Sequence, residues 1–196
     1  MVLIWNFQKF ARDAPASSKT PDENYDIVGY FLMDERKKTV LTFFLIVSAI
    51  VVVADQVTKF LVSEFIPLNT SETVVPGFLN LVHVRNSGAA FGVFSDKGNL
   101  ISRAILSAIS FFALLGIFWI VISQHLDRNA VIGFALFFGG AAGNFLDRII
   151  VGEVTDFVDI QVLGLHWPAF NVADSALTIG AIIFCFKLLF ATREST

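Results

Sequence analysis

Charged side chains are scarce in this chain, and cysteine and histidine are scarcer still. Only 16% of the 196 residues are Asp, Glu, Lys or Arg, and the formal net charge is −3, so the chain offers no basic surface for nucleic acid. The single cysteine, Cys185, cannot form an internal disulfide. Three scattered histidines give poor support for a metal site: His83, His125 and His166. The sequence lacks a Gly-x-Ser-x-Gly elbow, so serine-hydrolase chemistry is not indicated. It also lacks a phosphate-binding glycine loop.

Apolar residues dominate what is present. Hydrophobic residues make up 55% of the chain, 22 of them Phe, and the mean hydropathy is +0.70. Four apolar segments approach the roughly 17–25 residues that cross a bilayer core: Thr39–Ala54, Ala104–Ile122, Ala130–Leu146 and Ser175–Phe186. The last leads on to Thr192, interrupted only by Lys187. We therefore predict an all-α membrane protein, a bundle of four transmembrane helices with a small β element and loops on the outer surface. The expected helices cover about 39–62, 103–122, 130–147 and 173–191.

Basic residues near the helix ends indicate the orientation. Arg36, Lys37 and Lys38 precede the first apolar segment, and Arg128 lies in the short connection 123–129. Cytoplasmic loops carry an excess of Lys and Arg, so an even number of crossings leaves both termini in the cytoplasm. The two long loops, about 63–99 and 149–172, are then expected outside.

The N-terminal and first outer segments differ in pattern. Residues 1–38 are mixed and polar, which indicates a flexible cytoplasmic extension, and Met33 is an alternative start that makes residues 1–32 dispensable. The four-helix domain is expected over 39–192. Strand-like pieces at Val74-Val75 and Leu79–Val84 are bounded by turn residues, so a small sheet is expected on the outer membrane surface.

Ionisable residues at the membrane level are costly and are therefore functional candidates. Asp55 follows 16 uncharged residues, about 24 Å of helix, which places it near the outer edge of the hydrocarbon. Lys59 lies four residues on and shares its face. The two residues either form a structural pair that closes the helix end or take part directly in a site.

More polar residues are expected at the same outer boundary. The third helix ends in a glycine-rich run in which Gly139 and Gly143 favour close helix approach. Polar side chains follow along the chain: Asn144, Asp147, Arg148, Asp156, Asp159, Asn171 and Asp174. Asn171 or Asp174 could simply cap the fourth helix. Carboxylates gathered at one level repel unless they share protons, and two such groups divide their titration as general acid–base hydrolysis requires.

Five sequence blocks in this order resemble the lipoprotein signal peptidases, also called type II signal peptidases. The blocks are Asp55-Gln-x-x-Lys59, Asn86-Ser-Gly-Ala-Ala-Phe91, Gly140-x-x-Gly-Asn144-x-x-Asp-Arg148, Gly152-x-Val-x-Asp156-Phe-x-Asp159 and Phe170-Asn-x-Ala-Asp174. The resemblance runs from about residue 36 to 190. It implies an aspartic endopeptidase of the bacterial inner membrane, with its site near the outer, periplasmic face. Its substrates are prolipoproteins with a diacylglyceryl cysteine, which it cleaves just before that cysteine.

The resemblance also implies roles for individual residues. Asp156 and Asp174 match the catalytic pair, and Asp147 and Asp159 match positions that we assign to structure. Supporting or substrate-binding positions are Asp55, Lys59, Asn86, Asn144, Arg148 and Asn171. No cofactor or metal is implied. Membrane lipids and peptide antibiotics of the globomycin type are further expected partners.

Two other classes of protein remain open at this stage. A small transporter or channel could use intramembrane carboxylates to bind cations or protons, although the carboxylates gather at one surface and no inverted repeat is visible. The second class is a non-catalytic membrane scaffold with a polar cap. Cleavage of a lipidated prolipoprotein by the purified protein distinguishes all three.

Overall fold

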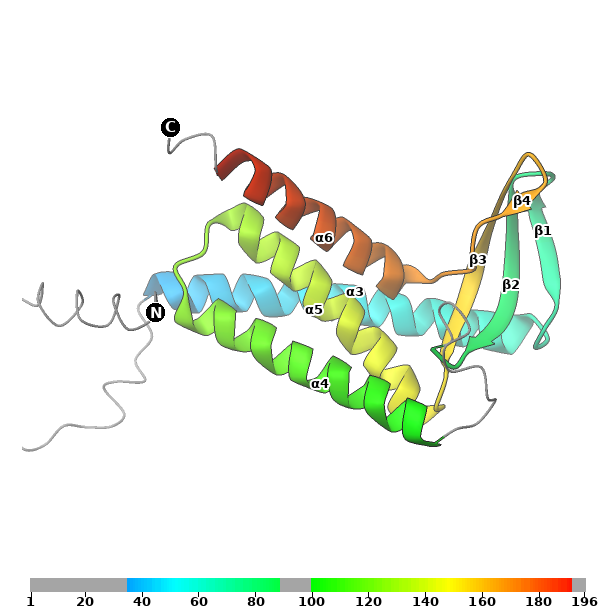
Figure 1. Cartoon of the computed structure of the whole chain (residues 1–196), viewed down its shortest axis with the longest axis horizontal. Helices are drawn as coiled ribbons and strands as arrows, with labels where there is room; N and C mark the ends of the chain where they lie inside the picture. Colours follow the sequence, from blue (N-terminus) through cyan, green and yellow to red (C-terminus); the bar gives the residue numbers. More distant parts are fainter. Residues whose placement is uncertain (1–34, 89–99, 192–196) are drawn as a thin grey trace, which may run out of the picture. The chain divides into compact units, whose positions relative to one another are not determined.

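The protein is a bundle of helices with a small antiparallel sheet at one end (Figure 1). The computed structural model describes residues 35–88 and 100–191. Its helices are α3 (Glu35–Phe65), α4 (Leu100–Ser123), α5 (Arg128–Ile150) and α6 (Val172–Ala191). The strands are β1 (Ser71–Val75), β2 (Leu79–Asn86), β3 (Val154–Val162) and β4 (Leu165–His166). The expected helical architecture with a small β element is therefore confirmed.

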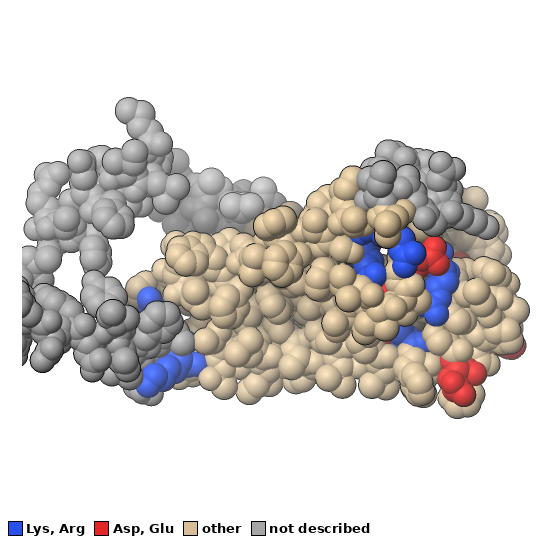
Figure 2. Space-filling model, turned by 90° about the horizontal axis from the view of Figure 1, so that it is seen from below, with Lys and Arg blue, Asp and Glu red and all other residues tan. Residues whose placement is uncertain are grey.

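Three helices among the described residues are long and apolar enough to cross a membrane. Their spans are Arg36–Phe65, Arg103–Ser123 and Arg128–Ile150, whereas α6 contributes a shorter apolar stretch, Val172–Phe186. Figure 2 shows Lys and Arg gathered towards the two ends of one face, with an uncharged stretch between them. Large apolar side chains such as Phe112 and Trp119 of α4 are about two-thirds exposed, as expected for residues in contact with lipid.

The helices extend beyond the apolar segments from which they were expected. The first expected helix, about 39–62, runs from Glu35 to Phe65, and the third, about 130–147, continues to Ile150. Hydropathy finds only the apolar centre of a helix, whereas polar residues at the membrane boundary remain helical. The extension 1–32 and the motif positions Ala89, Ala90 and Phe91 lie outside the described residues.

Close contact between α3 and α5 depends on two glycines, as their spacing predicts. A Cβ atom on Gly139 would lie 2.7 Å from Cβ of Val51, and one on Gly143 would lie 2.6 Å from Oδ2 of Asp55. Neither distance is compatible with a side chain, so the small residues bring the polar end of α5 directly against Asp55. At the opposite end of these helices, Phe44 and Val131 belong to an apolar cluster.

The sheet is antiparallel, with strand order β1-β2-β3-β4. It joins the two long loops, because β2 from the first loop pairs with β3 from the second. Only strands in the first loop were expected; β3 and β4 were not. A register shift between Leu81 and Val84 marks a bulge in the β2–β3 ladder, beyond which Val84 pairs with Asp156. Bulges re-aim side chains, and this one precedes the candidate site.

The sheet packs on the end of α3 through an apolar cluster. Phe157 of β3 is buried against Val62 at the end of α3 and Ile66 just beyond it. Backbone bonds also link β3 to the segment before α6, because the N–H groups of Phe157 and Val158 both donate to Phe170 O. This arrangement fixes β3 beside the N-terminus of α6.

Candidate active site

Asp156 lies on β3 and is almost completely buried. Its exposed fraction is 2%, and its two oxygens accept hydrogen bonds from two amides. Asn86 Nδ2, at the end of β2, donates to Oδ2 at 2.9 Å, and Asn171 Nδ2 donates to Oδ1 at 2.7 Å. The β2–β3 pairing places Asn86 two residues beyond Val84, the partner of Asp156, so both side chains are on one face of the sheet.

Asp174 lies in the first turn of α6 and forms a reciprocal cap with Asn171. The backbone N–H of Asp174 donates to Asn171 Oδ1 at 2.9 Å, and the N–H of Asn171 donates to Asp174 Oδ2 at 3.2 Å. This is the geometry of a capping box. The other oxygen, Oδ1, accepts from Asn144 Nδ2 at 2.8 Å. Asp174 is therefore a capping residue, but capping uses only one of its two oxygens.

Asn171 connects the two carboxylates. Its side chain is completely buried, its Nδ2 donates to Asp156, and its backbone N–H donates to Asp174. The same amide nitrogen lies 3.3 Å from Asn144 Oδ1. Residues from β3, α5 and α6 therefore meet in one hydrogen-bonded group.

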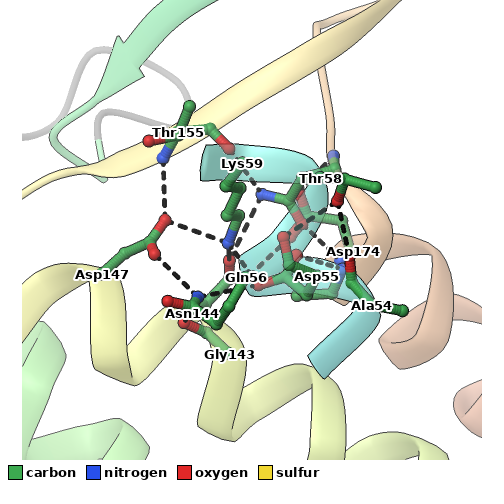
Figure 3. Close-up of polar contacts among 12 residues, drawn as sticks. Ala54, Asp55, Gln56, Thr58, Lys59, Gly143, Asn144, Asp147, Thr155 and Asp174 are labelled. Carbon is green, nitrogen blue, oxygen red and sulfur yellow. Dashed lines mark hydrogen bonds and ion pairs between the residues drawn. The ribbon is translucent and has the colours of Figure 1, made fainter. Parts of the chain in front are cut away.

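A buried ion-pair network lies beside this group (Figure 3). Lys59 is 3% exposed, and its Nζ lies 2.7 Å from Asp55 Oδ2 and 3.0 Å from Asp147 Oδ2. It also donates to Asn144 Oδ1 at 3.0 Å. Lys59 thus holds the amide oxygen of Asn144, which turns the Asn144 nitrogen towards Asp174.

Asp55 fixes the start of α6 from a different helix. Its Oδ1 accepts from the backbone N–H of Ala173 at 2.9 Å, one of the N–H groups that a helix start leaves without a partner. Among the described contacts, neither Asp55 nor Lys59 bonds to Asp156 or Asp174. The described contacts of the Asp55–Lys59 pair reach the candidate site through Asn144 and the first turn of α6.

Arg148 is half-buried at the end of α5. Its Nη1 donates to the backbone oxygen of Asn144 at 3.2 Å, so one of its donors is engaged within its own helix. All eight residues expected to be catalytic or supporting thus lie in or beside this network.

Two further residues in the network were not singled out from the sequence. Gln56 Nε2 donates to Asp147 Oδ1 at 2.9 Å, and the backbone N–H of Thr155 donates to Asp147 Oδ2 at 3.0 Å. Asp147, which was assigned to structure, therefore joins α3 and β3 to α5. The only sequence signal for Gln56 is its position inside the block that begins at Asp55.

Two aspartates on β3 have different electrostatic environments. Burial raises the pKa of Asp156 from 3.8 to about 6, and the nearby charge of Asp174 acts in the same direction against the hydrogen bonds from Asn86 and Asn171. Burial also opposes the charge on Asp159, but hydrogen bonds from Asn80 and His166 outweigh it and hold its pKa below the usual value. Asp156 can therefore keep a proton under conditions in which Asp159 is ionised.

Comparison with known proteins identifies the family. The family model for signal peptidase (SPase) II matches residues 47–190. The chain belongs to the signal peptidase II family. Among curated lipoprotein signal peptidases, that of Desulforapulum autotrophicum is 40% identical over 146 residues, covering 74% of this chain and 90% of the relative. That of Maridesulfovibrio salexigens is 44% identical over 137 residues, covering 69% of this chain and 88% of the relative.

A solved structure supports the same assignment. A bacterial membrane enzyme structure at 2.3 Å resolution is 35% identical, with a TM-score of 0.71, and the match covers 79% of this chain and 92% of that one. The expected family is confirmed, the protein is a peptidase, and the chain is a multi-pass membrane protein of bacterial type. Every candidate site residue of the chain lies within residues 47–190. Among residues 35–88 and 100–191, no group of three or more His, Cys, Asp or Glu is placed to hold a metal ion.

Proposed function

We propose that the protein is an aspartic endopeptidase that removes the signal peptide from diacylglyceryl-modified prolipoproteins, cutting just before the lipidated cysteine. Asp156 and Asp174 are its catalytic pair. The observation that carries this proposal is the link through Asn171, which bonds to both carboxylates although they come from separate segments. A pair that shares one proton provides both an acid and a base for hydrolysis.

The surroundings of the two carboxylates suggest how they divide the reaction. Asp156 is the more deeply buried, and its pKa is raised to about 6, so it is the partner that holds the proton. Asp174 is half-buried, and its carboxylate accepts hydrogen bonds from the Asn144 side chain and the Asn171 backbone, so we assign it the role of the base. Asp174 then takes a proton from water as the water attacks the scissile carbonyl. Asp156 donates its proton to the developing oxyanion. As the C–N bond breaks, the proton on Asp174 passes to the leaving amine and one hydroxyl proton of the tetrahedral intermediate returns to Asp156.

The neighbouring amides and cations position this pair. Asn86 and Asn171 orient Asp156, and Asn144 orients Asp174. Lys59 and Asp55 hold Asn144 and the start of α6, and Arg148 is available to bind the substrate backbone. The reaction needs no metal or organic cofactor, because the two carboxylates supply both proton transfers.

The placement of the pair suits a lipid-anchored substrate. β3, which carries Asp156, and the start of α6, which carries Asp174, lie where the sheet meets the helices (Figure 1). A diacylated cysteine keeps its acyl chains in lipid, so its peptide bond must be cut at the interface. We propose that α6 is a fourth crossing, which puts both termini in the cytoplasm and the pair at the outer face of the inner membrane. Globomycin-type peptides are then expected to inhibit by occupying the same site.

Cleavage of a defined substrate tests the proposed function. The full-length protein, purified in detergent, is incubated with a prolipoprotein that carries a diacylglyceryl cysteine and, separately, with the same prolipoprotein without the lipid. Mass spectrometry should find only the lipidated chain cut, with the modified cysteine as the new N-terminus. Equal cutting of both chains, or no cutting of either, would overturn the proposal.

A further inference from the structure

A second polar feature lies at the opposite end of the helices from the candidate active site. A cavity of about 510 Å³ opens between the first turns of α3 and the connection from α4 to α5. The lining residues used below are Arg36, Val40, Phe43, Leu126, Asp127 and Arg128. None of them belongs to the network around Asp156 and Asp174, so the proposed peptidase activity leaves this cavity unexplained.

The charges around the cavity favour an anion. Arg36 and Arg128 are both exposed and both line it. Guanidinium groups bind phosphate in a bidentate manner, and two of them can hold one phosphodiester from two sides. Asp127 also lines the cavity, but its carboxylate caps α5 by accepting the N–H of Ala130 at 2.9 Å. The balance of the three charges is positive.

The rest of the lining is apolar and continues into the membrane-spanning part. Val40, Phe43 and Leu126 are half-buried walls of the cavity. Arg36 begins the apolar span of α3, and Arg128 begins that of α5, so the cavity sits where hydrocarbon gives way to headgroups. A ligand that fits both the two arginines and the apolar walls must carry an anionic phosphate and a hydrocarbon chain.

We propose that this cavity binds an anionic phospholipid of the adjacent leaflet. Its phosphate lies between Arg36 and Arg128, and the upper part of one acyl chain lies against Phe43 and Leu126. Basic pockets between transmembrane helices are suited to such headgroups. The lipid would connect the start of α3 to the start of α5 at the end of the bundle that lacks the sheet.

Lipid titration of the intact protein tests this site. Full-length protein in mild detergent is titrated with dioleoyl phosphatidylglycerol or dioleoyl phosphatidylcholine, and native mass spectrometry counts the bound lipids. Phosphatidylglycerol should bind in preference to phosphatidylcholine. Arg36→Gln and Arg128→Gln should each weaken its binding about fivefold. Lys37→Gln is the matched control, because it removes the same charge from the same helix end without altering the cavity lining, and it should leave the affinity unchanged.

Three results would overturn the proposal. Equal binding of the two lipids would show that the net negative charge of the headgroup is not recognised. An equal loss of affinity in Lys37→Gln would show that the arginines act only through general surface charge. Displacement of the lipid by millimolar inorganic phosphate would show a free-phosphate site. Circular dichroism of each variant should match that of the parent protein, which separates lost binding from lost folding.

Discussion

Removing the amide of Asn86 should shift the pH dependence of cleavage. Asn86 Nδ2 donates to Asp156 Oδ2 at 2.9 Å, and this bond lowers the pKa of Asp156 against the effect of burial. A hydrogen bond to a charged group contributes about 1.5–3 kcal/mol, and 1.36 kcal/mol corresponds to one pKa unit. Asn86 is exposed, so water replaces part of the lost bond. The expected change is therefore a rise of about one unit.

The measurement is the pH profile of kcat/KM for a diacylglyceryl prolipoprotein. The proposed mechanism needs Asp156 protonated, so kcat/KM of the parent should fall as pH rises through about 6. In Asn86→Ala this alkaline limb should move up by about one unit. Asn86→Asp keeps an oxygen for the N–H of Gly88, which Asn86 Oδ1 accepts at 2.9 Å. It also places a second negative charge beside Asp156, so its limb should move at least as far.

Asn80→Ala is the matched control. Asn80 lies on the same strand and makes a similar bond, from Nδ2 to Asp159 Oδ2 at 2.9 Å, but that carboxylate is not part of the proposed pair. The alkaline limb of the kcat/KM profile of Asn80→Ala should therefore stay at the pH of the parent. If neither Asn86 variant moves the limb, or if both move it to lower pH, Asp156 is not the group whose proton is needed.

Three other predictions follow from the network and the orientation. Lys59→Met should lower the free energy of unfolding by about 3–5 kcal/mol, measured by thermal or denaturant unfolding in detergent, because two buried carboxylates lose their cation; an unchanged stability would refute the network. Arg148→Lys should reduce turnover markedly, since lysine cannot bind a carbonyl or carboxylate through two parallel bonds, and full activity would leave Arg148 as an interfacial charge only. Single cysteines at Ser71 and Asn129 should be labelled from opposite sides of the membrane, whereas labelling of both from outside would contradict the topology.

The helices could be predicted because their apolar runs are long and uninterrupted, but β3 could not. In the run Val-Thr-Asp-Phe-Val-Asp from Val154, apolar and polar residues do not alternate, and each face of the strand carries a carboxylate. Phe157 points to the apolar cluster at the end of α3, whereas Asp156 points to the candidate site. A functional residue on a strand weakens the alternation by which strands are found.

Individual contacts within the site were predictable only where they are local. The Asp55–Lys59 pair follows from helix spacing and is present at 2.7 Å. The second partner of Lys59, Asp147, comes from another helix, and no property of the sequence alone pairs them. Asp174 shows a further limit: capping and catalysis were weighed as alternatives, yet one carboxylate provides the cap and still faces Asn144.

The central claim, that Asp156 and Asp174 act as one catalytic unit, is tested most directly by their amide variants. Asparagine keeps the shape and the capping oxygen but cannot exchange a proton. Turnover of a diacylglyceryl prolipoprotein should fall by at least about 10⁴-fold in Asp156→Asn and in Asp174→Asn, and the double variant should be no worse. Each variant should remain in the membrane at the level of the parent. Substantial cleavage by either single variant would contradict the assignment.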